Sequence, residues 1–158
     1  MPTPWHQDQP YYNISGDKNV SFWIPIDSVQ KEWTLNFIKA SHKGTWYLPR
    51  TFETKQAKWF AAGELPEVPE SFESDQILGW EVNPGDAVAF HMATLHAAPG
   101  SVGNSRRRVF SLRCIGDDIR FIRRPWRTSP PFQGLDQILK TGDILNTNLF
   151  PVLFNNES

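Results

Sequence analysis

The stretch Val20–Ile26 (VSFWIPI) decides the fold class. It is rich in aromatic and β-branched side chains, which is typical of a buried β-strand. Similar short segments follow along the chain, separated by turn residues such as Asn83-Pro84-Gly85-Asp86. Several short strands joined by turns indicate a sandwich or jelly roll rather than a parallel α/β fold. We expect the other strands at Trp33–Ile38, Ile77–Val82, Ala87–His91 and Arg107–Ile115.

Helical signals are sparse. Apolar residues at near-helical spacing predict a short helix over Phe52–Ala62, and one or two helical turns are expected at Leu135–Leu139. The chain of 158 residues contains no internal repeat or long linker, so we expect a single domain over residues 1–158.

Composition excludes several classes of protein. A formal net charge of -1 argues against a general nucleic-acid binder and against a polybasic membrane-surface protein. The arginine-rich stretch 120–127 is therefore interpreted as a charged edge, with a phosphate or nucleic-acid contact as the less favoured alternative. The sequence has no apolar run long enough for a membrane span and no signal-peptide pattern, so we expect a cytoplasmic protein. The single cysteine, Cys114, excludes an internal disulfide and a cysteine-rich zinc site.

One candidate constellation consists of two histidines and an aspartate. On a strand, His6 and Asp8 would point to the same face. A second imidazole would complete a 2-His-1-carboxylate triad, which holds Fe(II) and leaves three positions open. His96 is the favoured third ligand, and His91 and His42 compete with it. Taken alone, the spacing is a weak signal, since a surface histidine beside a solvated aspartate is common.

A second constellation lies on the strand that follows three consecutive arginines. Alternation places Arg107, Val109, Ser111 and Arg113 on one face. An arginine suits a buried dicarboxylate, because its planar fork binds a carboxylate bidentately and stays charged. The alternative is a solvated basic edge that protects a strand from pairing.

Together these residues resemble the phytanoyl-CoA dioxygenase family of Fe(II)/2-oxoglutarate oxygenases. The resemblance rests on four segments in order: WHQDQPYY (residues 5–12), FWIPID (22–27), SHKG (41–44), and PGDAVAFHMATLHAAPG (84–100) continuing into RRVFSL (107–112). It covers roughly residues 4–115, which we take as the core, and leaves residues 116–158 as a C-terminal extension packed on the barrel.

The resemblance implies an all-β fold with minor helix, the double-stranded β-helix or cupin-like jelly-roll barrel. It also implies that His6, Asp8 and His96 are the catalytic iron ligands. Such an enzyme uses O2 and converts 2-oxoglutarate to succinate and CO2 while it hydroxylates a small organic molecule. The carboxylate of Asp8 favours hydroxylation, because related halogenases have a small residue at that position.

The resemblance further implies a pocket for the cosubstrate 2-oxoglutarate. Arg107 matches the arginine that pairs with the far carboxylate, and Arg108 is the alternative if the register differs by one residue. Gln7 and Trp23 match positions that line this pocket, and Ser111 is a weaker candidate.

The sequence departs from the family pattern in two places. Lys39-Ala40 stand where the family commonly has Pro-Gly before the SHKG segment. Only residues 1–5 precede the first motif, so we expect the chain to lack the N-terminal barrel strand and helices of this fold.

Two other functions stay open. A cupin-like metal-binding barrel, non-catalytic or with a different reaction, would keep the triad and need no arginine opposite it. A carbohydrate-binding jelly roll would use its tryptophans as surface platforms. For the oxygenase we expect a small-molecule substrate, no nucleic acid and no membrane, with a homo-oligomer left open.

Overall fold

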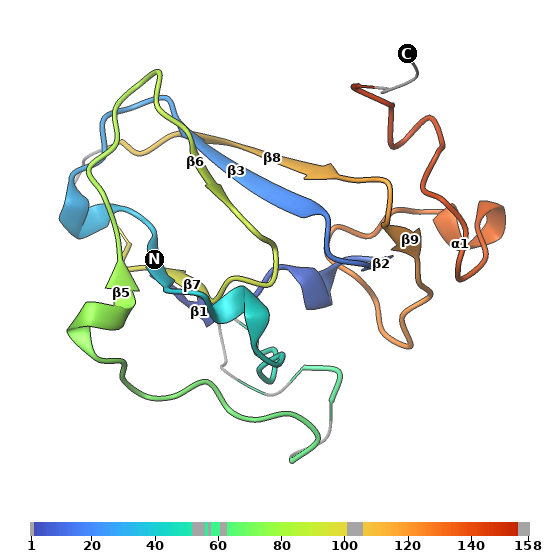
Figure 1. Cartoon of the computed structure of the whole chain (residues 1–158), viewed down its shortest axis with the longest axis horizontal. Coiled ribbons are helices and arrows are strands. Elements are labelled where there is room, and N and C mark those ends of the chain that lie inside the picture. Colours follow the sequence, from blue (N-terminus) through green and yellow to red (C-terminus); the bar gives the residue numbers. More distant parts are fainter. Residues whose placement is uncertain (1, 52–55, 57, 61–62, 101–105, 155–158) are drawn as a thin grey trace. The chain divides into compact units, whose positions relative to one another are not determined.

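The computed structural model describes residues 2–51, 56, 58–60, 63–100 and 106–154 (Figure 1). The regular elements among these residues are mainly short β-strands, with four 3-10 helices and one short α-helix. The chain divides into two compact units. The first contains Met1–Pro10 and Val20–Cys114, and the second contains Tyr11–Asn19 and Ile115–Ser158.

The first unit contains a four-stranded sheet in the order β1-β7-β4-β5. Its strands are β1 (Thr3–His6), β7 (His96–Ala98), β4 (Asn36–Ile38) and β5 (Ile77–Leu78), and neighbouring strands are antiparallel. His6 lies directly opposite His96 across β1 and β7, and Phe37 lies opposite His96 on the other side. A register shift separates Thr3 from His6, which is a common device for re-aiming side chains at a functional site.

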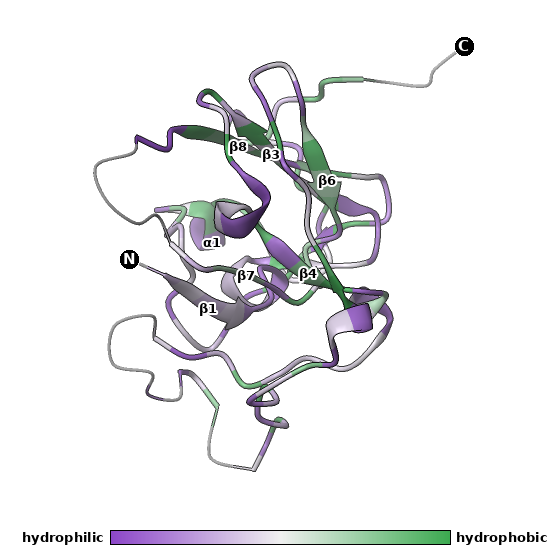
Figure 2. Cartoon of the chain, turned by 90° about the vertical axis from the view of Figure 1, so that its left-hand side faces the viewer, coloured by the Kyte–Doolittle hydropathy of each residue, from purple (hydrophilic) through white to green (hydrophobic). Residues whose placement is uncertain are grey.

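The same unit contains a three-stranded sheet in the order β6-β3-β8. Its strands are β6 (Val88–Phe90), β3 (Asn19–Pro25) and β8 (Val109–Ile115), and they lie side by side in Figure 1. In Figure 2, β6 and β8 are coloured as largely hydrophobic. Ser21 pairs with Phe90 and Trp23 with Val88, so these four side chains share one face of the sheet.

A common core joins the two sheets. Three buried residues of one layer meet three partly buried side chains of the other: Leu35, Phe37 and Ala98 pack against Trp23, Val88 and Phe90. Two antiparallel sheets on one apolar core, with little helix, confirm the prediction of an all-β jelly roll.

The second unit has a two-stranded sheet, β2 (Ile14–Ser15) with β9 (Arg120–Phe121), and the helix α1 (Leu135–Ile138). The helix confirms the helical turn expected at Leu135–Leu139. Arg124 donates to the carbonyls of Tyr12 and Ile14, at 3.2 and 2.9 Å. Arg120 and Arg123 also donate to backbone carbonyls, which favours the structural interpretation of the basic stretch.

The strands at Val20–Ile26 and Ala87–His91 lie within one residue of β3 and β6, but others are shorter than predicted. The predicted strand Trp33–Ile38 begins only at Asn36, because Lys31–Trp33 forms the 3-10 helix η2 and the Trp33 N–H donates to the Gln30 carbonyl. The predicted strand Arg107–Ile115 begins at Val109, because the Arg108 N–H donates to Asp27 Oδ2 at 2.8 Å instead of joining the ladder.

The strand predicted over Ile77–Val82 covers only Ile77–Leu78, and Val82 forms a separate bridge with Val29. The predicted helix over Phe52–Ala62 falls largely outside the described residues. The remaining 3-10 helices are η1 (Gln9–Tyr11), η3 (Ser41–Lys43) and η4 (Ser74–Gln76). No helix among the described residues is long and apolar enough to cross a membrane.

Candidate metal centre

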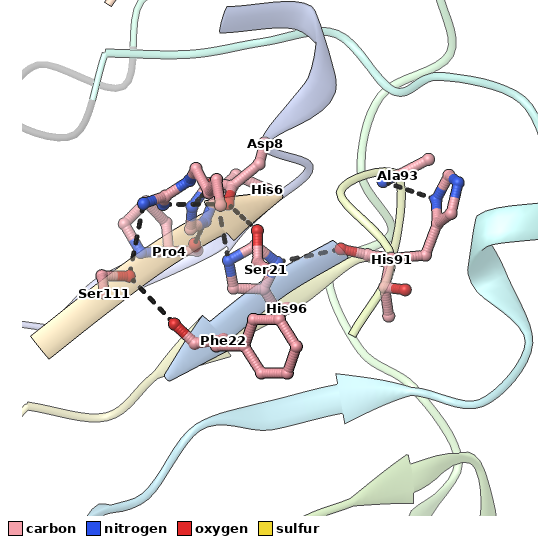
Figure 3. Close-up of polar contacts among 11 residues, drawn as sticks. Pro4, His6, Asp8, Ser21, Phe22, His91, Ala93, His96 and Ser111 are labelled. Atoms are coloured by element: carbon pink, nitrogen blue, oxygen red, sulfur yellow. Dashed lines mark hydrogen bonds and ion pairs between the residues drawn. The ribbon is translucent and has the colours of Figure 1, made fainter. Parts of the chain in front are cut away.

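Three potential metal ligands converge where β1 ends and β7 begins (Figure 3). The Nε2 atoms of His6 and His96 lie 3.6 and 3.8 Å from Asp8 Oδ1, and the two imidazole centroids are 4.2 Å apart. One ligand atom from each residue can be chosen so that all three lie within 4.8 Å of one another. The prediction that His6 and Asp8 share a strand is wrong, because β1 ends at His6 and the Asp8 N–H donates to the Met92 carbonyl.

Hydrogen bonds to the backbone fix the tautomer of both imidazoles. His6 Nδ1 lies 2.9 Å from the Pro4 carbonyl, and His96 Nδ1 lies 2.9 Å from the Thr94 carbonyl. A carbonyl oxygen can only accept, so each Nδ1 carries the proton and each Nε2 offers a lone pair. This arrangement is typical of metal-binding histidines, whose second nitrogen is oriented by a hydrogen bond.

The electrostatics also suit a cation. Burial lowers the pKa of His96 to about 4, so this imidazole is neutral at neutral pH. Burial alone would raise the pKa of the Asp8 carboxyl, but its contacts with the imidazoles of His6 and His96 and the positive charge of Arg113 hold that pKa well below its usual range. Three acceptor atoms that face one another in a buried site are stable when a cation lies between them. The residues present therefore fit a divalent metal with nitrogen and oxygen ligands.

Aromatic side chains surround His96. Its ring centroid is 4.7 Å from that of Phe90 and 6.0 Å from that of Phe37. Trp23 packs against the same apolar cluster on the β3 side. This places Trp23 among the side chains that line the space between the two sheets, and its contact with 2-oxoglutarate stays a prediction.

His42 and His91, the two alternative third ligands, contact each other. The rings of His42 and His91 lie 5.5 Å apart, and His91 Nδ1 accepts a hydrogen bond from the Ala93 N–H at 3.0 Å. Within the described part of the chain, the group of three metal-ligand side chains is formed with His96 and with neither of these two.

The adjacent arginines have different surroundings. Arg107 is half-buried, and its Nη1 donates to the Trp33 carbonyl at 2.6 Å. Arg108 is exposed and binds Asp27 through Nη2 at 2.7 Å and Nε at 3.1 Å. The hydrogen bonds from Arg108 lower the pKa of Asp27 to about 2. Arg108 is thus held in a surface ion pair, whereas Arg107 is half-buried and bonded to a backbone carbonyl.

Gln7 is buried and bonded to the backbone. Its Nε2 donates to the carbonyls of Ala93 at 2.9 Å and Thr45 at 3.3 Å, and its Oε1 accepts from the Tyr47 N–H at 2.8 Å. These bonds connect Gln7 to residues 45–47 and to the segment around Ala93. The contact of Gln7 with a cosubstrate stays a prediction.

Ser111 is exposed and lies over the neighbouring strand. Its Oγ donates to the Phe22 carbonyl at 3.5 Å and accepts from Arg113 Nη1 at 3.3 Å. The contact of Ser111 with 2-oxoglutarate stays a prediction.

Two residues at the site were not assigned a role from the sequence. Arg113 Nη2 and Ser21 Oγ donate to Asp8 Oδ2, at 3.0 and 3.2 Å. Strand alternation places Arg113 on the same face as Ser111, and Ser21 precedes Trp23 by two residues. These signals give the face of each side chain but not its partner, because the partner depends on how the strands pair.

Comparison with known proteins agrees with this geometry. The model of the family described as Phytanoyl-CoA dioxygenase (PhyH) matches residues 1–109. No curated protein sequence shows a comparable match.

Several solved structures share the fold. The non-heme alpha ketoglutarate dependent carbocyclase SnoK from nogalamycin biosynthesis is 20% identical, with a TM-score of 0.63 over 96% of this chain and 55% of SnoK. The epimerase SnoN from the same biosynthesis is 20% identical, with a TM-score of 0.66 over 98% of this chain and 57% of SnoN. EvdO2 from Micromonospora carbonacea var. aurantiaca is 22% identical, with a TM-score of 0.56 over 80% of this chain and 51% of EvdO2. The chain thus spans little more than half the length of these proteins.

Proposed function

The chain belongs to the phytanoyl-CoA dioxygenase family of Fe(II)/2-oxoglutarate oxygenases, and from that premise we propose that it hydroxylates a small organic molecule. The observation that carries the proposal is the convergence of two tautomer-fixed imidazoles and one carboxylate oxygen. In this proposal His6, Asp8 and His96 hold Fe(II) on one face and leave the opposite face open. Bound Fe(II) and 2-oxoglutarate supply the oxidising power, with O2 consumed and succinate and CO2 formed.

We propose Arg107 as the partner of the far carboxylate of 2-oxoglutarate. Its guanidinium lies at a half-buried position, where a bidentate ion pair is strong. The neighbouring Arg108 is engaged with Asp27, which favours Arg107 over the alternative register. Trp23, Phe37 and Phe90 provide an apolar wall beside the metal ligands, and such a wall excludes water from the reacting groups.

The choice of hydroxylation rests on Asp8. A carboxylate at this position occupies a coordination site that a halide needs in related halogenases. Two solved relatives are a carbocyclase and an epimerase, so the fold alone does not determine which reaction is catalysed. The mass of the product separates these reactions, because hydroxylation adds one oxygen atom to the substrate whereas epimerisation leaves its mass unchanged.

The proposal is tested by measuring succinate release with Fe(II), 2-oxoglutarate and O2, each omitted in turn. We expect release that needs all three and that is lost in Asp8→Asn, which keeps the shape of the side chain but removes its charge. Metal binding without any 2-oxoglutarate binding or turnover would refute the proposal and favour the cupin-like metal-binding barrel instead.

A further inference from the structure

The two oxygens of the Asp8 carboxylate have different surroundings. Oδ1 faces the Nε2 atoms of His6 and His96, at 3.6 and 3.8 Å. Oδ2 accepts from Arg113 Nη2 at 3.0 Å and from Ser21 Oγ at 3.2 Å. Figure 3 shows the Ser21 side chain pointing toward Asp8. A carboxylate can bind a metal through one oxygen or through both. Here one oxygen is turned toward the ligand cluster and the other is bonded to two donors from the opposite sheet.

We propose that Arg113 is a positioning residue that restricts Asp8 to one metal-binding oxygen. This inference rests on the proposed function, in which a position around the metal has to stay open for cosubstrate or O2. With Oδ2 bonded to Arg113 and Ser21, only Oδ1 is available to an ion. One further position around the metal then stays available to cosubstrate or O2.

The strand arrangement explains why Arg113 can do this. Arg113 lies on β8 and Ser21 on β3, both in the three-stranded sheet, whereas Asp8 follows β1 of the four-stranded sheet. The ion pair therefore ties the two layers together at the metal ligands. Ser21 is completely buried and the Asp8 side chain is 9% exposed, so water competes little for Oδ2.

Arg113 is itself held in place. Its Nη1 donates to Ser111 Oγ at 3.3 Å, and Ser111 Oγ donates to the Phe22 carbonyl. These bonds fix the plane of the guanidinium. A planar guanidinium held on both sides orients a carboxylate better than a flexible ammonium does. Partners of this kind typically change metal affinity by about 10- to 100-fold when they are removed.

The experiment compares metal binding by the wild-type protein with binding by Arg113→Met, Arg113→Lys and Ser21→Ala. Co(II) serves as the probe, because its visible absorption reports the number of ligands around it. Arg50→Met is the matched control, since Arg50 forms a forked ion pair with Glu67 at an exposed position.

We expect Arg113→Met to lose about 10- to 100-fold in Co(II) affinity and to change the Co(II) spectrum. Arg113→Lys should restore the wild-type spectrum, because it keeps a charged donor to Oδ2, and Ser21→Ala should lose less affinity than Arg113→Met. Arg50→Met should match the wild type in both measurements. If Arg113→Met does not fold, the lysine and Ser21 variants carry the comparison.

Three results separate the two proposals. Wild-type affinity and an unchanged spectrum in Arg113→Met would overturn the positioning role and leave the proposed function standing. A weaker affinity with an unchanged spectrum would also overturn it, because a merely structural arginine gives that pattern. No Co(II) or Fe(II) binding by the wild-type protein would overturn the proposed function and the inference with it.

Discussion

Replacing Arg107 with alanine should weaken 2-oxoglutarate binding by about two orders of magnitude and leave metal binding intact. Arg107 is half-buried just before β8, and its Nη1 lies 2.6 Å from the Trp33 carbonyl. Removing one partner of a buried charge pair costs about 3–5 kcal/mol. Because Arg107 is only half-buried, we take the lower limit, and about 3 kcal/mol corresponds to roughly a hundredfold in Kd.

The assay is calorimetric titration of 2-oxoglutarate into Fe(II)-loaded protein without O2. Arg108→Ala is the matched control, because the ion pair with Asp27 holds that side chain at the exposed surface. It should bind 2-oxoglutarate like the wild type. The reasoning is refuted if Arg107→Ala keeps its affinity for 2-oxoglutarate, or if the loss falls on Arg108→Ala instead.

Three further predictions concern stability. The metal-free protein should lose stability as the pH falls from 6.5 to about 4, because the pKa of buried His96 is lowered to about 4 and the unfolded chain takes up the proton first. Thermal denaturation at several pH values measures this dependence of stability on pH. His96→Gln should reduce that dependence. Ala40→Gly should raise the free energy of unfolding by about 0.5–1 kcal/mol, because Ala40 has a φ of 58°, where a Cβ is unfavourable. A lower free energy of unfolding for Ala40→Gly in a urea titration would contradict this prediction. Gln7→Ala should lower the free energy of unfolding by about 2–4 kcal/mol, because it removes the side-chain partner of the buried Ala93 carbonyl and of the half-buried Tyr47 N–H. A loss under about 1 kcal/mol in a urea titration would contradict this prediction.

The fold class could be predicted because its signals are local. The apolar stretch at β3 and the Asn-Pro-Gly-Asp turn before β6 each specify a short strand or its end. The left-handed backbone at Ala40 also has a local explanation, since this is a position where the family commonly has glycine.

The strand ends could not be predicted, because distant residues determine them. β8 begins at Val109 since the Arg108 N–H is bonded to Asp27, which lies 81 residues earlier in the chain. The same holds for the site. The types and spacing of His6, Asp8 and His96 suggest a common role, but the partners of Asp8 Oδ2 depend on how three separate strands come together.

The direct pairing of His6 with His96 has a consequence for folding. The side chains of a strand alternate between faces, so a slip of one residue between β1 and β7 would turn one imidazole away from the other. An ion that binds both imidazoles therefore binds only the correctly registered sheet. Such an ion adds about 2.7 kcal/mol of stability at a hundredfold excess over its Kd. In the proposed enzyme, iron availability would then determine how much of the chain is folded as well as how fast it turns over.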